Sequence, residues 1–354
     1  MTPPPGLEAR IGLSRGTLEV SVDLTASPGE VVAVLGPNGG GKTSALLALA
    51  GVIPLRSGRV AVAGEEWESA GRRRRLPEER SVGLLLAEPL LFPHLRALDN
   101  VAYGLRSRGV GRRAARARAH DELGRVGLAS HHGARPRELS SGQAARVALA
   151  RALATDPRLL LLDEPLASLD PDTRARTRSD LSARLAAYDG VTVLVTHDPL
   201  DALTLADRLV FVEGGRVTQS GSPGEVLREP RSAYVATVVG LNLYAGELGP
   251  AGTVRLDGAG SLVTADAPAG RVWATIAPSA VSLHRQPPEG SPRNNWRLRI
   301  TDITLQGQSA RVGLAGALPL TAEVTLAAVT AMALRAGDEV WASVKATEVR
   351  TYPR

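Results

Sequence analysis

The chain has 354 residues, a net charge of +6 and no cysteine, so it is long enough for two or three domains but has no disulfide framework and no thiolate metal site. Hydrophobic residues make up 44% of the sequence, yet no apolar run approaches the roughly 18 residues that a membrane span requires, which excludes a pore. Aromatic residues make up only 3% and do not interleave with the arginine runs, so we expect solvated basic faces and no nucleic-acid partner.

The N-terminal region leads into a phosphate-binding motif. Residues 1–6 lack the basic and apolar segments of a secretory signal, so we expect the chain to stay in the cytoplasm. Alternating apolar residues predict a pair of strands over 7–25. The apolar run 31–35 predicts a buried strand before a glycine-rich loop, and an alanine- and leucine-rich helix follows at 44–50.

The loop fits the pattern GxxxxGK[ST] in the strand–loop–helix context that the pattern requires. Glycines let backbone N–H groups turn towards an anion, and the positive N-terminal end of the helix adds to this. Lys42 is placed for the β- and γ-phosphates of a nucleotide, and the Thr43 hydroxyl for Mg²⁺. The residues expected to bind nucleotide here are Gly36, Pro37, Asn38, Gly39, Gly40, Gly41, Lys42, Thr43 and Ser44.

Further elements follow in order along the chain. Short strands are expected at 59–63 and 81–86, and an arginine-rich helical stretch extends to about residue 127. The sequence LSSGQ at 139–143 then opens an alanine-rich helix. Ser140 is a capping residue there, and the start of this helix could also hold phosphate.

Two acids end the next buried strand, LLLLDEP. Ligands of a covered parallel sheet lie at the carboxyl ends of its strands, so Asp163 suits the Mg²⁺ shell and Glu164 can orient a water. The sequence SLD at 168–170 then precedes a polar helix. A further buried strand at 191–196 delivers His197 to the same edge of the sheet.

In this order, the phosphate loop, LSSGQ, LLLLDEP, SLD and THD resemble the ATP-binding subunit of ATP-binding-cassette (ABC) transporters, over roughly residues 7–235. The resemblance implies a head-to-tail homodimer in which ATP is sandwiched between the phosphate loop of one copy and the LSSGQ segment of the other. The residues that it adds to the nucleotide site are Ser140, Ser141, Gly142, Gln143, Asp163 and Asp170.

The resemblance also implies roles and partners. Glu164 is the catalytic acid group, His197 the γ-phosphate switch and Asp170 the residue that communicates across the dimer. ATP and Mg²⁺ are the implied cofactors, with Thr43 and Asp163 at the metal. The implied partners are integral membrane permease subunits and, through them, an extracytoplasmic solute-binding protein, so the chain is expected to be peripheral to the cytoplasmic face of the membrane.

The chain departs from the family pattern at three places. The glutamine expected before Glu88 is Ala87, which affects the rate or the coupling to the membrane subunits. The first glycine of the LSSGQ motif is Ser141, a mild change. No aromatic residue precedes Trp67 to stack on adenine, so Arg10 or Arg15, as planar cations, are the alternatives.

The C-terminal part has short alternating strands with glycine and proline turns, which predict a small β-barrel or sandwich. From residue 291 it resembles the molybdate-binding oligomer-type (Mop) domain of molybdate importer ATPases. The resemblance implies an oxyanion site at Ser291, Arg293, Asn294 and Lys345, although a serine of the family is Ala328 here. The alternative is a barrel that only dimerises or docks regulators.

The sequence therefore predicts an α/β P-loop NTPase of the ABC type followed by an all-β, OB-like domain of the TOBE or Mop kind. The expected boundaries are 1–235 for the ATP-binding domain, with a helical subdomain at about 88–150, then 236–290 for a β-rich linker and 291–354 for the Mop-like domain.

The predicted function is the ATP-hydrolysing motor of an importer for molybdate or tungstate. The alternatives are an importer motor for sulfate, iron(III), polyamine or sugar, an ABC ATPase that acts on nucleic acid or the ribosome, and a regulatory protein that does not hydrolyse ATP.

Overall fold

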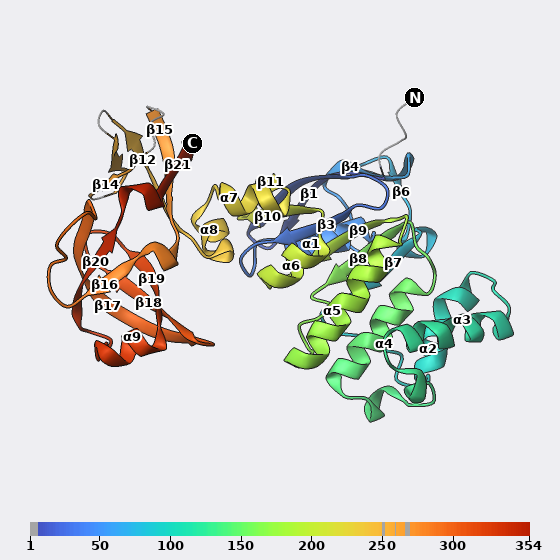
Figure 1. Cartoon of the computed structure of the whole chain (residues 1–354). Helices are drawn as coiled ribbons and strands as arrows, with labels where there is room; N and C mark the ends of the chain where they lie inside the picture. Colours follow the sequence, from blue (N-terminus) through green and yellow to red (C-terminus); the bar gives the residue numbers. More distant parts are fainter. Residues whose placement is uncertain (1–5, 250–251, 259, 266–269) are drawn as a thin grey trace. The chain divides into compact units, whose positions relative to one another are not determined.

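The computed structural model describes residues 6–249, 252–258, 260–265 and 270–354. The chain forms two compact units, Met1–Val226 and Leu227–Arg354, which are described separately (Figure 1). Among the described residues no helix is long and apolar enough to cross a membrane.

A mixed sheet runs through the first unit, and eleven of its strands lie within the described residues. In sheet order they are β6 (Arg73–Arg74), β5 (Glu65–Ser69), β4 (Ser57–Val62), β1 (Leu7–Arg15), β2 (Leu18–Ala26), β11 (Arg216–Gly221), β10 (Arg208–Glu213), β3 (Val31–Leu35), β9 (Val191–Val195), β8 (Leu159–Asp163) and β7 (Val82–Leu85).

The strands that lead to the candidate site are parallel. β10, β3, β9, β8 and β7 pair side by side in one direction, and every residue of β3, β8 and β9 is buried. Continuous burial is expected for parallel strands covered on both faces. The carboxyl ends of β3 and β8 flank that of β9, so residues far apart in sequence meet at one edge of the sheet.

Six α-helices complete the first unit within the described residues, and a seventh crosses the division between the units. They are α1 (Lys42–Leu49), α2 (Ala97–Ser107), α3 (Arg112–Arg125), α4 (Ser141–Leu153), α5 (Pro171–Ala186), α6 (Pro199–Leu205) and α7 (Pro223–Arg228). α2, α3 and α4 pack together around their own core, which includes Val101, Leu123 and Val147 (Figure 1). Alanines such as Ala115 and Ala119 are fully buried there and allow the helices to approach closely.

The second unit is mainly β-structure, which confirms the prediction of an all-β C-terminal region. One five-stranded sheet contains β14 (Ser261–Val263), β13 (Thr253–Leu256), β12 (Asn242–Leu248), β15 (Gly270–Ile276) and β21 (Val349–Pro353), in that order, among the residues described. The other contains β16 (Ser282–His284), β20 (Glu339–Val344), β17 (Asn294–Gln306), β18 (Ser309–Ala315) and β19 (Leu320–Thr325). The short helices α8 (Ala233–Val239) and α9 (Leu326–Ala331) accompany them.

The two sheets of the second unit share one hydrophobic core, which includes Ile276 from one sheet and Leu298 and Val340 from the other. The chain also crosses between the sheets: β16 pairs with β20, and the last strand, β21, returns to pair with β15. Residues on both sides of position 291 therefore depend on each other for burial.

Candidate nucleotide-binding site

The glycine loop between β3 and α1 has a backbone that only glycine fits. Gly36 has a φ of 156°, and a Cβ there would lie 2.0 Å from the carbonyl oxygen of Val212. Gly41 has a φ of 96°, and its Cβ would lie 2.8 Å from Val20. The missing side chains leave the loop's backbone N–H groups open to an approaching anion.

The loop forms the floor of a cavity of about 390 Å³. The cavity contains loop residues predicted from the motif together with residues from β8 and β9. Its lining residues are Arg15, Leu18, Asn38, Gly39, Gly40, Gly41, Lys42, Thr43, Ser44, Ala87, Asp163, Glu164 and Val195. Arg15, but not Arg10, is among them, and the apolar Leu18 beside it was not anticipated from the sequence.

Lys42 is buried at the start of α1, with 8% of its surface exposed. Its Nζ donates hydrogen bonds to the carbonyl oxygens of Gly36 at 2.8 Å and Pro37 at 2.9 Å, which uses two of its three protons. Burial lowers the pKa of Lys42, while the charges of Glu164 and Asp163 act against that change. The loop therefore holds the ammonium group in place, where it can help the loop to bind phosphate.

Thr43 and Asp163 form a pair of oxygen ligands. The Thr43 hydroxyl donates a hydrogen bond of 2.9 Å to Oδ2 of Asp163. Burial raises the pKa of Asp163, and the bond from Thr43 and the charge of Lys42 counteract this. One hydroxyl and one carboxylate fit Mg²⁺, which typically takes one or two protein ligands besides water and substrate phosphates.

Glu164 follows Asp163 in a strained backbone conformation. Its φ of 52° lies in the left-handed region, which is rare for residues other than glycine and is concentrated at functional sites. Oε1 of Glu164 lies 2.8 Å from Nδ1 of His197. Oε2 is buried and has no hydrogen-bond partner among the described residues. An acceptor without a partner at the cavity wall can bind and polarise a water.

Burial raises the pKa of Glu164, and the hydrogen bond and charge of His197 oppose this rise. The charge of Asp163 adds to it. An acid whose pKa is raised is a better proton acceptor at neutral pH as long as it remains ionised.

The LSSGQ segment begins α4. Ser140 caps this helix: its Oγ accepts a hydrogen bond of 3.2 Å from the Gln143 N–H, and its own N–H donates to Oε1 of Gln143 at 2.9 Å. A Cβ at Gly142 would lie 3.0 Å from the side chain of Leu169, so this segment and the SLD segment are neighbours within one chain. Ser141 is exposed beside them.

Asp170 caps α5. Its Oδ1 accepts a 3.0 Å hydrogen bond from the Thr173 N–H, and bonds from Thr173 lower the pKa of Asp170. Neither Asp170 nor the LSSGQ residues are among those that line the loop cavity. The structure thus brings the loop together with Asp163, Glu164 and His197. Of the other predicted residues, Ser140, Ser141 and Asp170 are exposed and Gly142 and Gln143 are half-buried, all of them outside this cavity.

Sequence reasoning missed two arginines that tie these segments together. Arg151, on α4, donates hydrogen bonds of 2.9 Å to the carbonyl oxygens of Pro89 and Leu90, in the segment just after Ala87. Arg174, on α5, pairs with Asp198, the neighbour of His197. The available signal was the helical spacing: Arg151 lies about two turns after Gln143 on α4, and Arg174 lies one turn after Asp170 on α5, so each shares a helix face with a predicted site residue.

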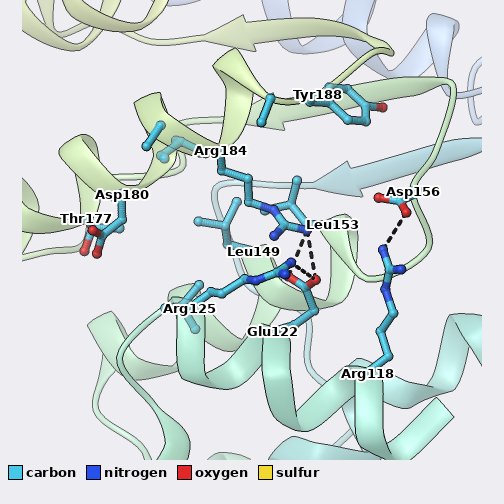
Figure 2. Close-up of a pocket in the computed structure, with 14 residues that line it drawn as sticks. Arg118, Glu122, Arg125, Leu149, Leu153, Asp156, Thr177, Asp180, Arg184 and Tyr188 are labelled. Atoms are coloured by element: carbon cyan, nitrogen blue, oxygen red, sulfur yellow. Dashed lines mark hydrogen bonds and ion pairs between the residues drawn. The ribbon is translucent and has the colours of Figure 1, made fainter. Parts of the chain in front are cut away.

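A larger cavity of about 590 Å³ lies between α3, α4 and α5. Most of its charged groups are paired: Glu122 accepts from Arg125 and Arg184, and Arg118 pairs with Asp156 (Figure 2). None of the predicted site residues line it. Its ion pairs connect α3 to α5, so it is better explained as part of the packing between these helices.

The expected oxyanion residues of the second unit are not gathered in one place. The Asn294 amide is buried and is engaged with backbone atoms of Val263 and Val344. Lys345 lines a cavity of about 320 Å³, whose polar residues include Ser279, Ser282, Ser343 and Glu348. Ser291 and Arg293 are exposed and are not among its lining residues. Ala328 lies in α9.

Family comparisons match both units. The model described as "ABC transporter" matches residues 20–167, and that described as "TOBE domain" matches residues 290–351. Molybdenum import ATP-binding protein ModC of Mycobacterium tuberculosis is 40% identical over 347 residues, which cover 94% of each chain.

Other relatives are similar over different lengths. Sulfate/thiosulfate import ATP-binding protein CysA 2 of Chromobacterium violaceum is 36% identical and covers 93% of this chain and 90% of its own. Fe(3+) ions import ATP-binding protein FbpC of Agrobacterium fabrum is 43% identical, but over only 62% of this chain and 61% of its own. A dimeric post-hydrolysis structure of the ATP-binding cassette MJ0796, bound to ADP and phosphate, is 25% identical with a TM-score of 0.55, over 61% of this chain and 98% of that one.

Proposed function

This chain belongs to the family of ABC transporter ATP-binding proteins, and we propose that it is the ATP-hydrolysing motor of an importer for molybdate or tungstate. The observation that carries the choice of solute is the 40% identity to a molybdenum import protein over 94% of both chains, which includes the C-terminal unit. A sulfate importer motor is the second candidate, because the sulfate/thiosulfate relative also matches 93% of this chain. Molybdate, tungstate and sulfate are all tetrahedral dianions.

We assign the chemistry to the edge of the sheet where β3, β8 and β9 end. The loop N–H groups and Lys42 bind the β- and γ-phosphates. Thr43 and Asp163 hold Mg²⁺, which supplies positive charge to the phosphate oxygens when it is bound. Glu164 orients the attacking water and accepts its proton. We assign to His197, whose Nδ1 lies 2.8 Å from Oε1 of Glu164, the contact with the γ-phosphate.

The exposure of Ser140, Ser141 and Asp170 supports a homodimer. In a single chain Ser140, Gly142 and Gln143 are not among the residues that line the loop cavity, so a second copy would have to complete the nucleotide site. The match to a dimeric cassette with bound ADP and phosphate agrees with this assembly. A single copy is then expected to bind ATP but to hydrolyse it slowly.

The motor would act on integral membrane permease subunits and, through them, on an extracytoplasmic solute-binding protein, from a peripheral position on the cytoplasmic face of the membrane. Ala87 stands at the cavity wall without the amide that a glutamine would offer to Mg²⁺. Arg151 still joins the segment after Ala87 to α4 through two backbone carbonyls. We therefore assign the coupling between ATP hydrolysis and the permease subunits to this connection between Arg151 and the backbone of the segment after Ala87.

Deleting the gene for this chain in its source organism is expected to lower molybdate uptake by about tenfold or more when the medium contains nanomolar molybdate. The reason is that ATP hydrolysis drives the import cycle. Uptake of isotopically labelled molybdate, sulfate and iron(III) is measured in parallel. The wild-type gene should restore molybdate uptake, and a Glu164→Gln gene should not. A loss confined to sulfate or iron would contradict the proposed solute but not the motor.

We further propose that Lys345 and its neighbouring serines bind the oxyanion, because a tetrahedral dianion is best held by hydroxyl donors and a cation. Titration calorimetry of the full chain with molybdate, tungstate and sulfate should then show heat of binding. Lys345→Met should lower the measured affinity by tenfold or more. Arg293→Met, at an exposed residue outside the Lys345 cavity, is the matched control. No heat from any of the three anions would leave the second unit with a purely structural or docking role.

A further inference from the structure

Two helices of the first unit begin directly after residues of the proposed hydrolysis site. α5 begins at Pro171, immediately after Asp170, and α6 begins at Pro199, two residues after His197. The two helices pack against each other. Whatever joins their first turns therefore joins the SLD segment to His197.

Arg174 makes this connection. It lies one turn into α5, and its Nη2 lies 2.8 Å from Oδ2 of Asp198 and also pairs with Asp201. Arg178, one turn later, adds a 2.6 Å bond from its Nε to Oδ1 of Asp201. The side chain of Asp201 is 4% exposed and that of Arg174 is 19% exposed, so these contacts are largely shielded from solvent.

Asp198 fixes the turn between β9 and α6. Its Oδ1 accepts a hydrogen bond of 2.7 Å from the Leu200 N–H and so caps α6, and its own N–H donates to the Thr196 hydroxyl at 3.1 Å. These bonds fix the backbone on both sides of His197. The carboxylate that caps α6 is the same one that Arg174 holds.

The charges around Arg174 strengthen the connection. Burial lowers the pKa of this guanidinium, but Asp201, Asp198 and Glu164 together outweigh burial and raise it. Arg174 therefore stays charged, and its guanidinium also interacts electrostatically with Glu164. A planar fork can hold two carboxylates at once, whereas a lysine offers a single point charge.

We propose that Arg174 is a positioning residue for ATP hydrolysis: it locks Asp198, and through it His197, to the first turn of α5, so that the SLD segment and His197 move as one body. The inference rests on the proposed hydrolytic function. Without Arg174, Asp198 and Asp201 face each other with Arg178 as the remaining cation of the cluster. His197 then loses its fixed position relative to Glu164, and displacements of about 1 Å can cost roughly 100-fold in rate.

Replacing Arg174 by methionine in the full chain is expected to lower kcat for ATP hydrolysis by about 10- to 100-fold, with KM for ATP changed by less than about threefold, because no phosphate contact is removed. Arg176→Met is the matched control, since Arg176 is exposed on the same helix. Arg174→Lys should recover part of the rate. A kcat for Arg174→Met equal to that of wild type and control would overturn the inference.

A double-mutant cycle separates positioning from general stability. In a His197→Ala background Arg174→Met should have almost no further effect on kcat, because its action passes through that imidazole. If the double variant instead lost kcat by the product of the two single-variant losses, the two residues would act independently, and this would overturn the inference. If Arg174→Met does not fold, Asp198→Asn replaces it, since the amide keeps the capping oxygen and removes the charge; an unchanged kcat there would also overturn the inference. A wild-type chain without ATPase activity would instead contradict the proposed function.

Discussion

Glu164→Gln is expected to lower kcat for ATP hydrolysis by about 10²- to 10⁴-fold, the range that a general base contributes, while ATP binding persists. The amide keeps the size of the side chain, but it cannot accept a proton from water. Lys42, the loop N–H groups and Asp163 are untouched, so affinity for ATP should change little. Steady-state turnover and equilibrium binding of a fluorescent ATP analogue measure the two effects separately.

The pH dependence of the same variant tests the assignment further. Burial raises the pKa of Glu164 above its usual 4.5, so the acidic side of the wild-type rate profile should fall off at a higher pH than an exposed glutamate would give. This limb should be absent from the residual activity of Glu164→Gln. Glu78→Gln, at an exposed carboxylate of the same unit, serves as the control. Turnover by Glu164→Gln at the wild-type rate would refute the role of Glu164.

Glu68→Leu is expected to destabilise the first unit by about 3–5 kcal/mol, the usual cost of removing one partner of a buried ion pair. Glu68 and Arg80 are paired at 2.5 Å with side-chain exposures of 3% and 0%. Glu68 also accepts a hydrogen bond of 2.8 Å from the Leu55 N–H. The substitution would therefore leave a buried guanidinium and a buried N–H without their acceptor.

Urea unfolding followed by helical circular dichroism measures this loss, because most of the helices lie in the first unit. Glu66→Gln, at an exposed position of the same strand, should be neutral within about 0.5 kcal/mol. Adding Arg80→Met to Glu68→Leu should recover part of the stability, since it removes the unpaired charge. A Glu68→Leu chain as stable as wild type would mean that Arg80 does not depend on its partner.

Arg80 is an exception to the expectation that the arginines form solvated faces. The arginine excess predicted solvated faces, and Arg72 and Arg73 are indeed exposed. Arg80, however, is fully buried and donates to the carbonyl oxygens of Ala48 and Leu49 at the end of α1. Nothing local in the sequence distinguishes it, because its burial depends on carbonyls and a carboxylate brought from other elements.

The strands show the same contrast. β1, β2, β3, β8 and β9 were predicted from short-range patterns, since alternation or continuous apolar runs report how many faces of a strand are buried. β5 and β6 were not predicted, although Trp67 on β5 is buried in the main core. Their sequence is charged and irregular, and they become strands only because β5 pairs with β4 and β6 pairs with β5.

By itself the sequence determined the phosphate loop, the strand-end acids and the family, because each depends on residues adjacent in the chain and on a fixed order of motifs. The tertiary structure alone decided which side chains meet: Glu164 with His197, Thr43 with Asp163, Arg174 with Asp198. It also decided that Asn294, expected at an oxyanion, has its amide bonded to backbone atoms of neighbouring strands. The physical reason is that a charge or amide has several possible partners in a chain of this length, and packing selects among them.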